Sequence, residues 1–195
     1  MKHIHCLLLL LSWVVLNAQD LSSTYTISVD HITVGTLTAT KTIDGDKTTY
    51  TINSTSVIHL LGKTTITTSF VGVFRNGVLE SSAYTSEKDG HPYDSSVISE
   101  SNGIYTISRK GKKTTLSNPI TLVTCMLYFE KPVSGAQYFD VLEAVYSPIE
   151  STTTNTYLYT DSSNNEKTTY TYANNVLEQG TTNHTLYNFT FRLKE

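Results

Sequence analysis

The sequence predicts an all-β protein, an antiparallel curved sheet or barrel-like meander with one short helix at about residues 119–130. Three observations support this prediction. The chain is rich in threonine and has 13 tyrosines, residue types that fit a pleated, half-buried surface. Polar and apolar residues alternate with a period of two along many segments. Turn-forming residues separate these segments at short intervals, as in sandwiches and barrels.

The first 19 residues are expected to be a signal peptide rather than part of this fold. An apolar run from Cys6 to Leu16 follows a basic start, and Ala18 provides a small residue near a cleavage point. The run is shorter than the roughly 20 residues that a membrane-spanning helix needs. We therefore expect an exported protein of the periplasm or extracellular space, with a single domain at residues 20–195. No transmembrane segment is expected once the signal peptide is removed.

The strands are predicted from alternation and from the turns between them. In the segment from Tyr25 to Val29, every second residue is apolar, which gives one face toward a core and one toward water. Asp44-Gly45 and Asn76-Gly77 are expected to form two-residue type I′ hairpin turns, because both central positions of that turn need positive φ. The predicted strands lie near 23–30, 33–43, 47–59, 63–74, 78–87, 94–100, 104–109, 112–116, 136–146, 152–160, 167–173 and 183–193.

One segment departs from this pattern and is predicted to be the helix. Asn118-Pro119 resembles a helix start, and Lys131-Pro132 resembles a helix end. The apolar residues that recur between them at helical spacing are Ile120, Val123, Met126 and Leu127. Cys125 lies in the same segment among apolar neighbours, so we interpret it as a buried core cysteine rather than as a nucleophile.

No pattern indicates a catalytic or metal site, so the chain is predicted not to be an enzyme and to need no cofactor. The histidines beyond the signal peptide lie far apart in sequence, although His31 and His59 could meet on adjacent strands. The oxygen-rich loop from Asp161 to Glu166 fits a solvated turn better than a calcium site. A net charge of −3 and one short basic cluster, residues 109–113, give no indication of a nucleic-acid partner.

Several structural motifs resemble those of a family of uncharacterised exported Bacteroidota proteins. They are Val34-Gly35, the turn Phe74-x-Asn76-Gly77-x-Leu79, the segment Met126-Leu127-Tyr128-Phe129-Glu130-x-Pro132 and the strand Tyr170-x-Tyr172-x-Asn174. The family is similar in pattern to periplasmic domains of unknown function with a curved, barrel-like sheet. The resemblance implies that fold over nearly the whole mature chain, and it implies no catalytic residue.

Two functions follow as hypotheses. The first is a periplasmic binding or carrier protein, in which a curved sheet encloses an apolar or lipid-like small molecule. The second is a structural or protein-interaction module of the cell envelope, with no small ligand and a protein partner. For the first, we expect six residues to line the cavity or its lid, and the alternative is that they only fill a core. These residues are Phe70, Phe74, Met126, Phe129, Tyr157 and Tyr159.

Overall fold

The computed structural model describes residues 19–59, 62–183 and 188–194, so the expected signal peptide lies outside the described residues except for its last position. The first eight strands are β1 (Gln19–Val29), β2 (Ile32–Asp44), β3 (Lys47–His59), β4 (Lys63–Arg75), β5 (Val78–Lys88), β6 (His91–Ser101), β7 (Ile104–Arg109) and β8 (Lys112–Leu116). After one 3-10 turn, η1 (Thr124–Tyr128), come β9 (Gln137–Asp140), β10 (Val145–Thr153), β11 (Thr156–Thr160), β12 (Lys167–Ala173), β13 (Val176–Asn183) and β14 (Asn188–Leu193).

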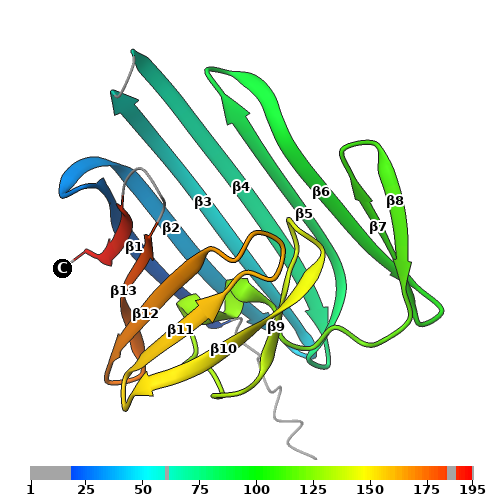
Figure 1. Cartoon of the computed structure of the whole chain (residues 1–195). Helices are drawn as coiled ribbons and strands as arrows, with labels where there is room; N and C mark the ends of the chain where they lie inside the picture. The colour runs from blue at the N-terminus through cyan, green and yellow to red at the C-terminus, as the bar shows by residue number, and fades with distance from the viewer. Residues whose placement is uncertain (1–18, 60–61, 184–187, 195) are drawn as a thin grey trace, which may run out of the picture.

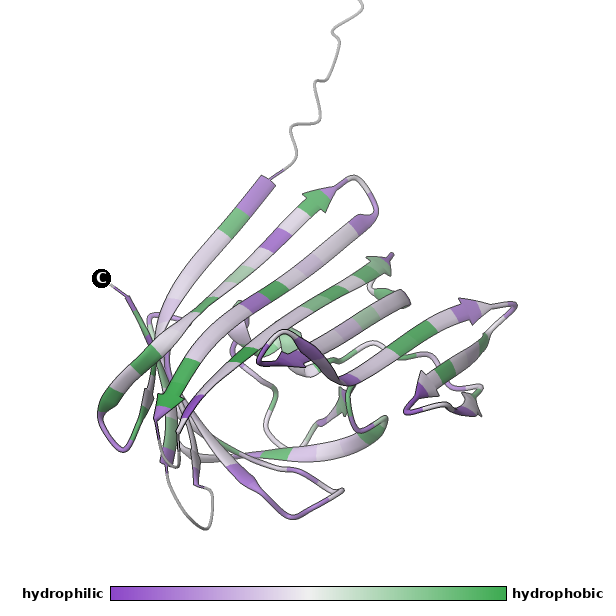
Figure 2. Ribbon diagram, turned by 90° about the horizontal axis from the view of Figure 1, so that it is seen from above, coloured by the Kyte–Doolittle hydropathy of each residue, from purple (hydrophilic) through white to green (hydrophobic). Residues whose placement is uncertain are grey.

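All these strands belong to one antiparallel sheet, which curls without closing. Its order is β8-β7-β6-β5-β4-β3-β2-β1-β14-β13-β12-β11-β10-β9. We call β1–β8 the first flank and β9–β14 the second flank, and they join where β1 pairs with β14. Within the described residues, β8 and β9 are the two end strands of the sheet, and the two flanks curve toward each other (Figures 1 and 2). The expected all-β, curved and barrel-like class is thus confirmed.

Two-residue turns connect most of the hairpins. Asn76 and Gly77 both have positive φ, at 50° and 77°, as a type I′ turn requires. The expected turn at Asp44-Gly45 is displaced by one residue, because Asp44 still pairs with Lys47. The loop is therefore Gly45–Asp46, with positive φ only at glycine, which is the pattern of a type II′ turn.

The second flank differs most from the predicted strands. The segment expected as one strand at 136–146 is divided into β9 and β10 by a turn, in which Ala144 has a φ of 58°. The strand expected at 152–160 is likewise two strands, because β10 ends at Thr153 before a tight turn into β11. Strand β13 (Val176–Asn183) was not predicted, and it lies between the strands expected at 167–173 and 183–193. Gly180 interrupts the alternation of apolar and polar side chains along it.

The one short helix expected at about residues 119–130 is found in that segment, but it is a single 3-10 turn and not a longer α-helix. This segment, which we call the plug, contains only the short turn η1. Before η1, its backbone groups bond to the sheet, whereas η1 itself has local bonds such as that from the amide of Met126 to the carbonyl of Val123 at 3.0 Å. The carbonyl of Ile120 accepts from the amide of Leu79 at 2.8 Å, and the carbonyl of Leu122 accepts from the amide of Phe139 at 2.8 Å. Those bonds hold the part of the plug before η1 between the flanks, and Val123 has extended backbone angles.

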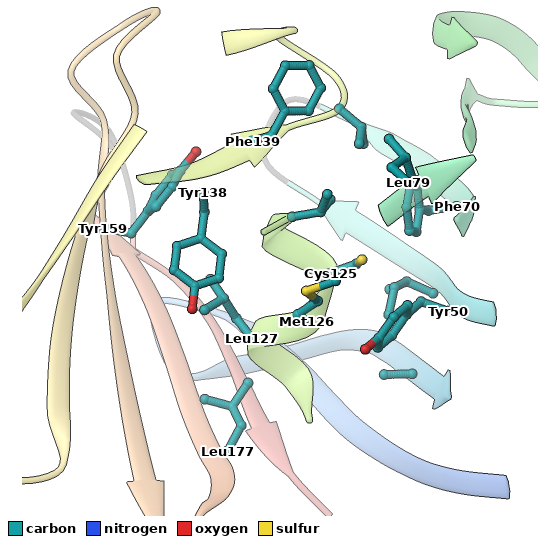
Figure 3. Packing of buried hydrophobic residues seen from close by; sticks show 14 of the residues in the cluster. Tyr50, Phe70, Leu79, Cys125, Met126, Leu127, Tyr138, Phe139, Tyr159 and Leu177 are labelled. Carbon is teal, nitrogen blue, oxygen red and sulfur yellow. The ribbon is translucent and has the colours of Figure 1, made fainter. Parts of the chain in front are cut away.

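The plug lies in the centre of the hydrophobic core. Ile120, Val123 and Leu127 are fully buried, and η1 contacts β3, β9 and β13. Figure 3 shows η1 with Tyr50, Phe70 and Leu79 on one side and Tyr138 and Tyr159 on the other. Tyr172 of β12 donates its hydroxyl to the carbonyl of Leu127 at 2.7 Å. The plug therefore forms part of the core between the two flanks.

In the described part of the chain, no helix is both long enough and apolar enough to cross a membrane.

Candidate functional site

A cavity of about 490 Å³ remains beside the plug, between the two flanks. Side chains of β3, β4 and β5 form one wall, those of β11 and β12 form the opposite wall, and η1 contributes Thr124, Cys125 and Tyr128. The turn after β9 and the loop after β11 complete it. A volume of this size falls in the range of small-molecule sites, which is roughly 300–1,000 Å³.

The wall of the first flank is a single row of side chains across three strands. Phe70 of β4 pairs with Ile52 of β3 on one side and with Tyr84 of β5 on the other. Because directly opposed residues in an antiparallel sheet point to the same face, all three reach the concave side together. The register of the sheet therefore builds a continuous apolar and aromatic surface.

The wall of the second flank is aromatic as well. Tyr159 of β11 lies opposite Thr168 of β12, and Tyr170 follows two residues later on the same face. Tyr170 and Tyr128 are half-buried, and desolvation raises the pKa of both phenols. Both border the cavity, and no hydrogen bond in the described part of the chain involves either hydroxyl. These two hydroxyl groups are thus available to a ligand.

Four carboxylates border the cavity, and none of its lining residues is basic. They are Asp140, Glu143, Asp161 and Glu166. Glu143 is neutralised by Arg109 of β7, whose guanidinium donates two hydrogen bonds of 2.6 Å to its carboxylate. None of the ion pairs in the described residues involves Asp140, Asp161 or Glu166. The cavity therefore has a negative electrostatic potential.

Asp140 is the most constrained of these acids. Its Oδ1 accepts hydrogen bonds from the amides of Leu142 and Glu143 at 2.8 and 3.0 Å, which fixes the side chain. Its Oδ2 accepts a long hydrogen bond of 3.5 Å from the hydroxyl of Tyr159. Burial raises the pKa of Asp140 above its ordinary value, and the negative charges of Asp161 and Glu143 raise it further. The two hydrogen bonds from backbone amides lower the pKa but do not cancel the rise. A cationic group placed beside Oδ2 would stabilise the ionised carboxylate of Asp140 and lower its pKa.

Cys125 borders the same cavity but is not set up as a nucleophile. Its side chain is 5% exposed, and burial raises the pKa of the thiol. A raised pKa keeps the sulfur protonated, whereas the thiolate is the reactive form. The lining residues include no histidine that could act as its base. Its interpretation as a buried core cysteine is confirmed by its position.

Of the six residues expected at a ligand site, two lie in the cavity wall, namely Phe70 and Tyr159. The other four lie in or against the packed core. Phe74 is 1% exposed and packs edge-on against the ring of Tyr50. Phe129 packs against the same ring, with 5.6 Å between the two ring centroids. Tyr157 packs edge-on against Tyr172, and Met126 is 8% exposed in η1.

The sequence interpretation overlooked the acidic groups and Tyr170. The loop from Asp161 to Glu166 was read as a solvated turn, and Asp140 was placed inside a continuous strand. Tyr170 had a usable signal, because Thr168, Tyr170 and Tyr172 alternate along one strand. His31 precedes β2 and His59 ends β3, both exposed, and the described residues contain no cluster of three or more potential metal ligands.

Comparisons with known proteins agree with this fold. A family model described as "Domain of unknown function (DUF6134)" matches residues 25–194. Among curated proteins there is no significant match. The chain is similar to the crystal structure of a beta-barrel-like protein of domain of unknown function DUF1849 from Brucella abortus, with a TM-score of 0.55 and 10% identity. That match covers 89% of this chain and 95% of the other, and at this identity it shows the fold alone.

These comparisons confirm two parts of the expected resemblance, which are a family of unknown function and a similarity in fold to a beta-barrel-like protein. Export and a Bacteroidota origin stay predictions.

Proposed function

We propose that this chain, which belongs to the DUF6134 family of domains of unknown function, is an exported binding or carrier protein that holds an amphiphilic small molecule in the cavity beside its plug. The observation that supports the proposal is the cavity itself. It measures about 490 Å³ and is walled by aromatic side chains from both flanks, although the plug already fills the core. The apolar part of such a ligand would lie against Ile52, Phe70 and Leu142.

A binding role also agrees with the chemistry of the lining residues. A site for nucleophilic catalysis would activate its nucleophile, whereas burial raises the pKa of the Cys125 thiol and the lining residues include no histidine beside it. The expected site of action is the periplasm or the extracellular space, on the strength of the apolar N-terminal run.

The alternative, a protein-interaction module of the envelope, would use the open edges of the sheet. Strand β8 is one such edge in the described residues, and it carries Lys112 and Lys113. Lysine on an edge strand discourages pairing with another chain. The β8 edge is therefore weaker support for a protein-interaction role than the cavity is for a ligand-binding role.

Filling the cavity tests the binding function. Thr124 of η1 is half-buried and borders the cavity, so Thr124→Phe places an aromatic ring in that space. We expect the wild-type protein to bind the neutral fluorescent probe N-phenyl-1-naphthylamine, and the variant to bind it about tenfold more weakly, because the ring occupies volume that the probe needs.

The matched control is Thr67→Phe, an identical change at an exposed position of β4. It should leave the affinity for the probe unchanged. Circular dichroism of both variants shows whether the sheet is retained. Equal affinity of Thr124→Phe and wild type would mean that the probe binds elsewhere and that this cavity is not the site.

A further inference from the structure

We propose that the cavity selects amphiphiles with a positively charged amine head group and rejects those with a carboxylate head group. This inference rests on the binding function proposed above, and it adds the chemical class of the ligand. It derives from three features of the cavity wall, which are its charge, the orientation of Asp140 and the unpaired phenol groups.

The first feature is an imbalance of charge. Asp140, Asp161 and Glu166 have no cationic partner in the described residues, and the nearby guanidinium of Arg109 is already bonded to Glu143. Arg109 also lies 3.7 Å from Asp94, on the side of β6. A carboxylate ligand would therefore enter a negative field with no counter-charge, and like charges brought together at a binding site cost several kcal/mol.

The second feature is the fixed geometry of Asp140. Two backbone amides donate hydrogen bonds to its Oδ1, and its Oδ2 accepts a long hydrogen bond of 3.5 Å from the hydroxyl of Tyr159. A carboxylate held in this way is already oriented for a ligand, so binding costs little side-chain entropy. An ammonium group at Oδ2 would form a charge-assisted hydrogen bond, which is stronger than a neutral one.

The third feature is the aromatic surround. Tyr128 and Tyr170 border the cavity with hydroxyl groups that make no hydrogen bond in the described part of the chain. A phenol oxygen accepts from an N–H donor, and the faces of the rings attract a cation within about 6 Å of their centroids. Aromatic rings and carboxylates together are the surroundings that an amine prefers, and the apolar row of Ile52, Phe70 and Tyr84 opposite would take the hydrocarbon part.

The experiment compares three ligands that have the same number of carbon atoms and carry different head groups. Dodecylamine, dodecanol and dodecanoate are each used below their micelle concentrations to displace N-phenyl-1-naphthylamine from the full mature chain at neutral pH. We expect dodecylamine to displace the probe at an at least tenfold lower concentration than dodecanoate, with dodecanol between them, because only the amine gains from the acidic wall (about tenfold for each 1.4 kcal/mol).

Asp140→Asn keeps the oxygen that accepts the two amide hydrogen bonds but removes the charge. We expect it to weaken dodecylamine binding by about tenfold and to leave dodecanol unchanged, so that dodecanol also reports an intact cavity. Glu150→Gln, an exposed change in β10 that does not border the cavity, is the control for a simple loss of net charge.

The outcomes separate the two proposals. If the probe does not bind to the wild-type protein, the binding function fails and this inference fails with it. If the probe binds but the three ligands displace it equally, or dodecanoate displaces it best, the binding function stands and the selection of amines is overturned. An unchanged preference for dodecylamine in Asp140→Asn would also overturn it.

Discussion

Replacing Gly35 with alanine is expected to destabilise the protein by roughly 3 kcal/mol, the upper part of the usual range for overpacking. Gly35 lies in β2, opposite Ile27 of β1 and Ser56 of β3. A Cβ at this position would lie 2.0 Å from the carbonyl oxygen of Thr55 and 2.7 Å from the Cα of Ser56. Both are backbone atoms, so no side-chain rotation relieves the contact and β3 has to move away from β2.

Urea unfolding followed by circular dichroism measures this effect. Thr36→Ala is the control, because it changes the next, exposed residue of the same strand and is expected to cost less than about 1 kcal/mol. Similar unfolding midpoints for the two variants would mean that β2 and β3 do not approach each other at Gly35 as described. A glycine in a strand interior often marks such a close backbone approach.

Replacing Leu127 with alanine is expected to cost about 3 to 5 kcal/mol, because it removes the centre of the plug. Leu127 is fully buried, and its carbonyl accepts the hydrogen bond of Tyr172. The methyl groups that are lost leave a void bounded by both flanks, and the plug is tied to the sheet on either side, which limits collapse. The same denaturant series measures the change in the free energy of unfolding.

Leu21→Ala provides the matched control for this change. Leu21 is 44% exposed near the start of β1, so the same truncation there creates no cavity and is expected to cost less than about 1 kcal/mol. Equal losses of stability at the two positions would show that Leu127 of the plug contributes no more to the free energy of unfolding than an exposed leucine does.

The strands of the first flank could be predicted from the sequence because local signals agree there. The segment 47–59 has the predicted bounds in the structure, where β3 is Lys47–His59. Its alternation is regular and a glycine-containing turn precedes it. Asn76-Gly77 likewise needs no tertiary context, because positive φ at both positions is tolerated best by those two residue types.

The plug could not be predicted in the same way. Apolar residues at helical spacing between two prolines fit a helix, but they also fit an extended segment packed between two parts of a sheet. Ile120 and Val123 are fully buried because the sheet surrounds them, and the sheet also bonds to the carbonyl groups of Ile120 and Leu122. The burial of these residues depends on the distant strands, so the spacing of apolar residues alone does not determine the local conformation.

The candidate site was accessible to sequence reasoning only in part. Phe70 and Tyr159 were expected from their aromatic character and their places in strands, and both border the cavity. Asp140 was not, because its role depends on a turn whose residues include neither glycine nor proline. Only the curl of the sheet places the turn after β9 and the loop after β11 opposite β3, β4 and β5.

The measurement that tests the central proposal most directly is native mass spectrometry of the protein purified from its producing cell, with organic extraction of whatever it carries. We expect one defined adduct per chain that extracts as an amphiphile and is lost in Thr124→Phe but kept in Thr67→Phe. A bare mass for the wild-type chain would contradict a tightly binding carrier and would favour the envelope interaction module instead.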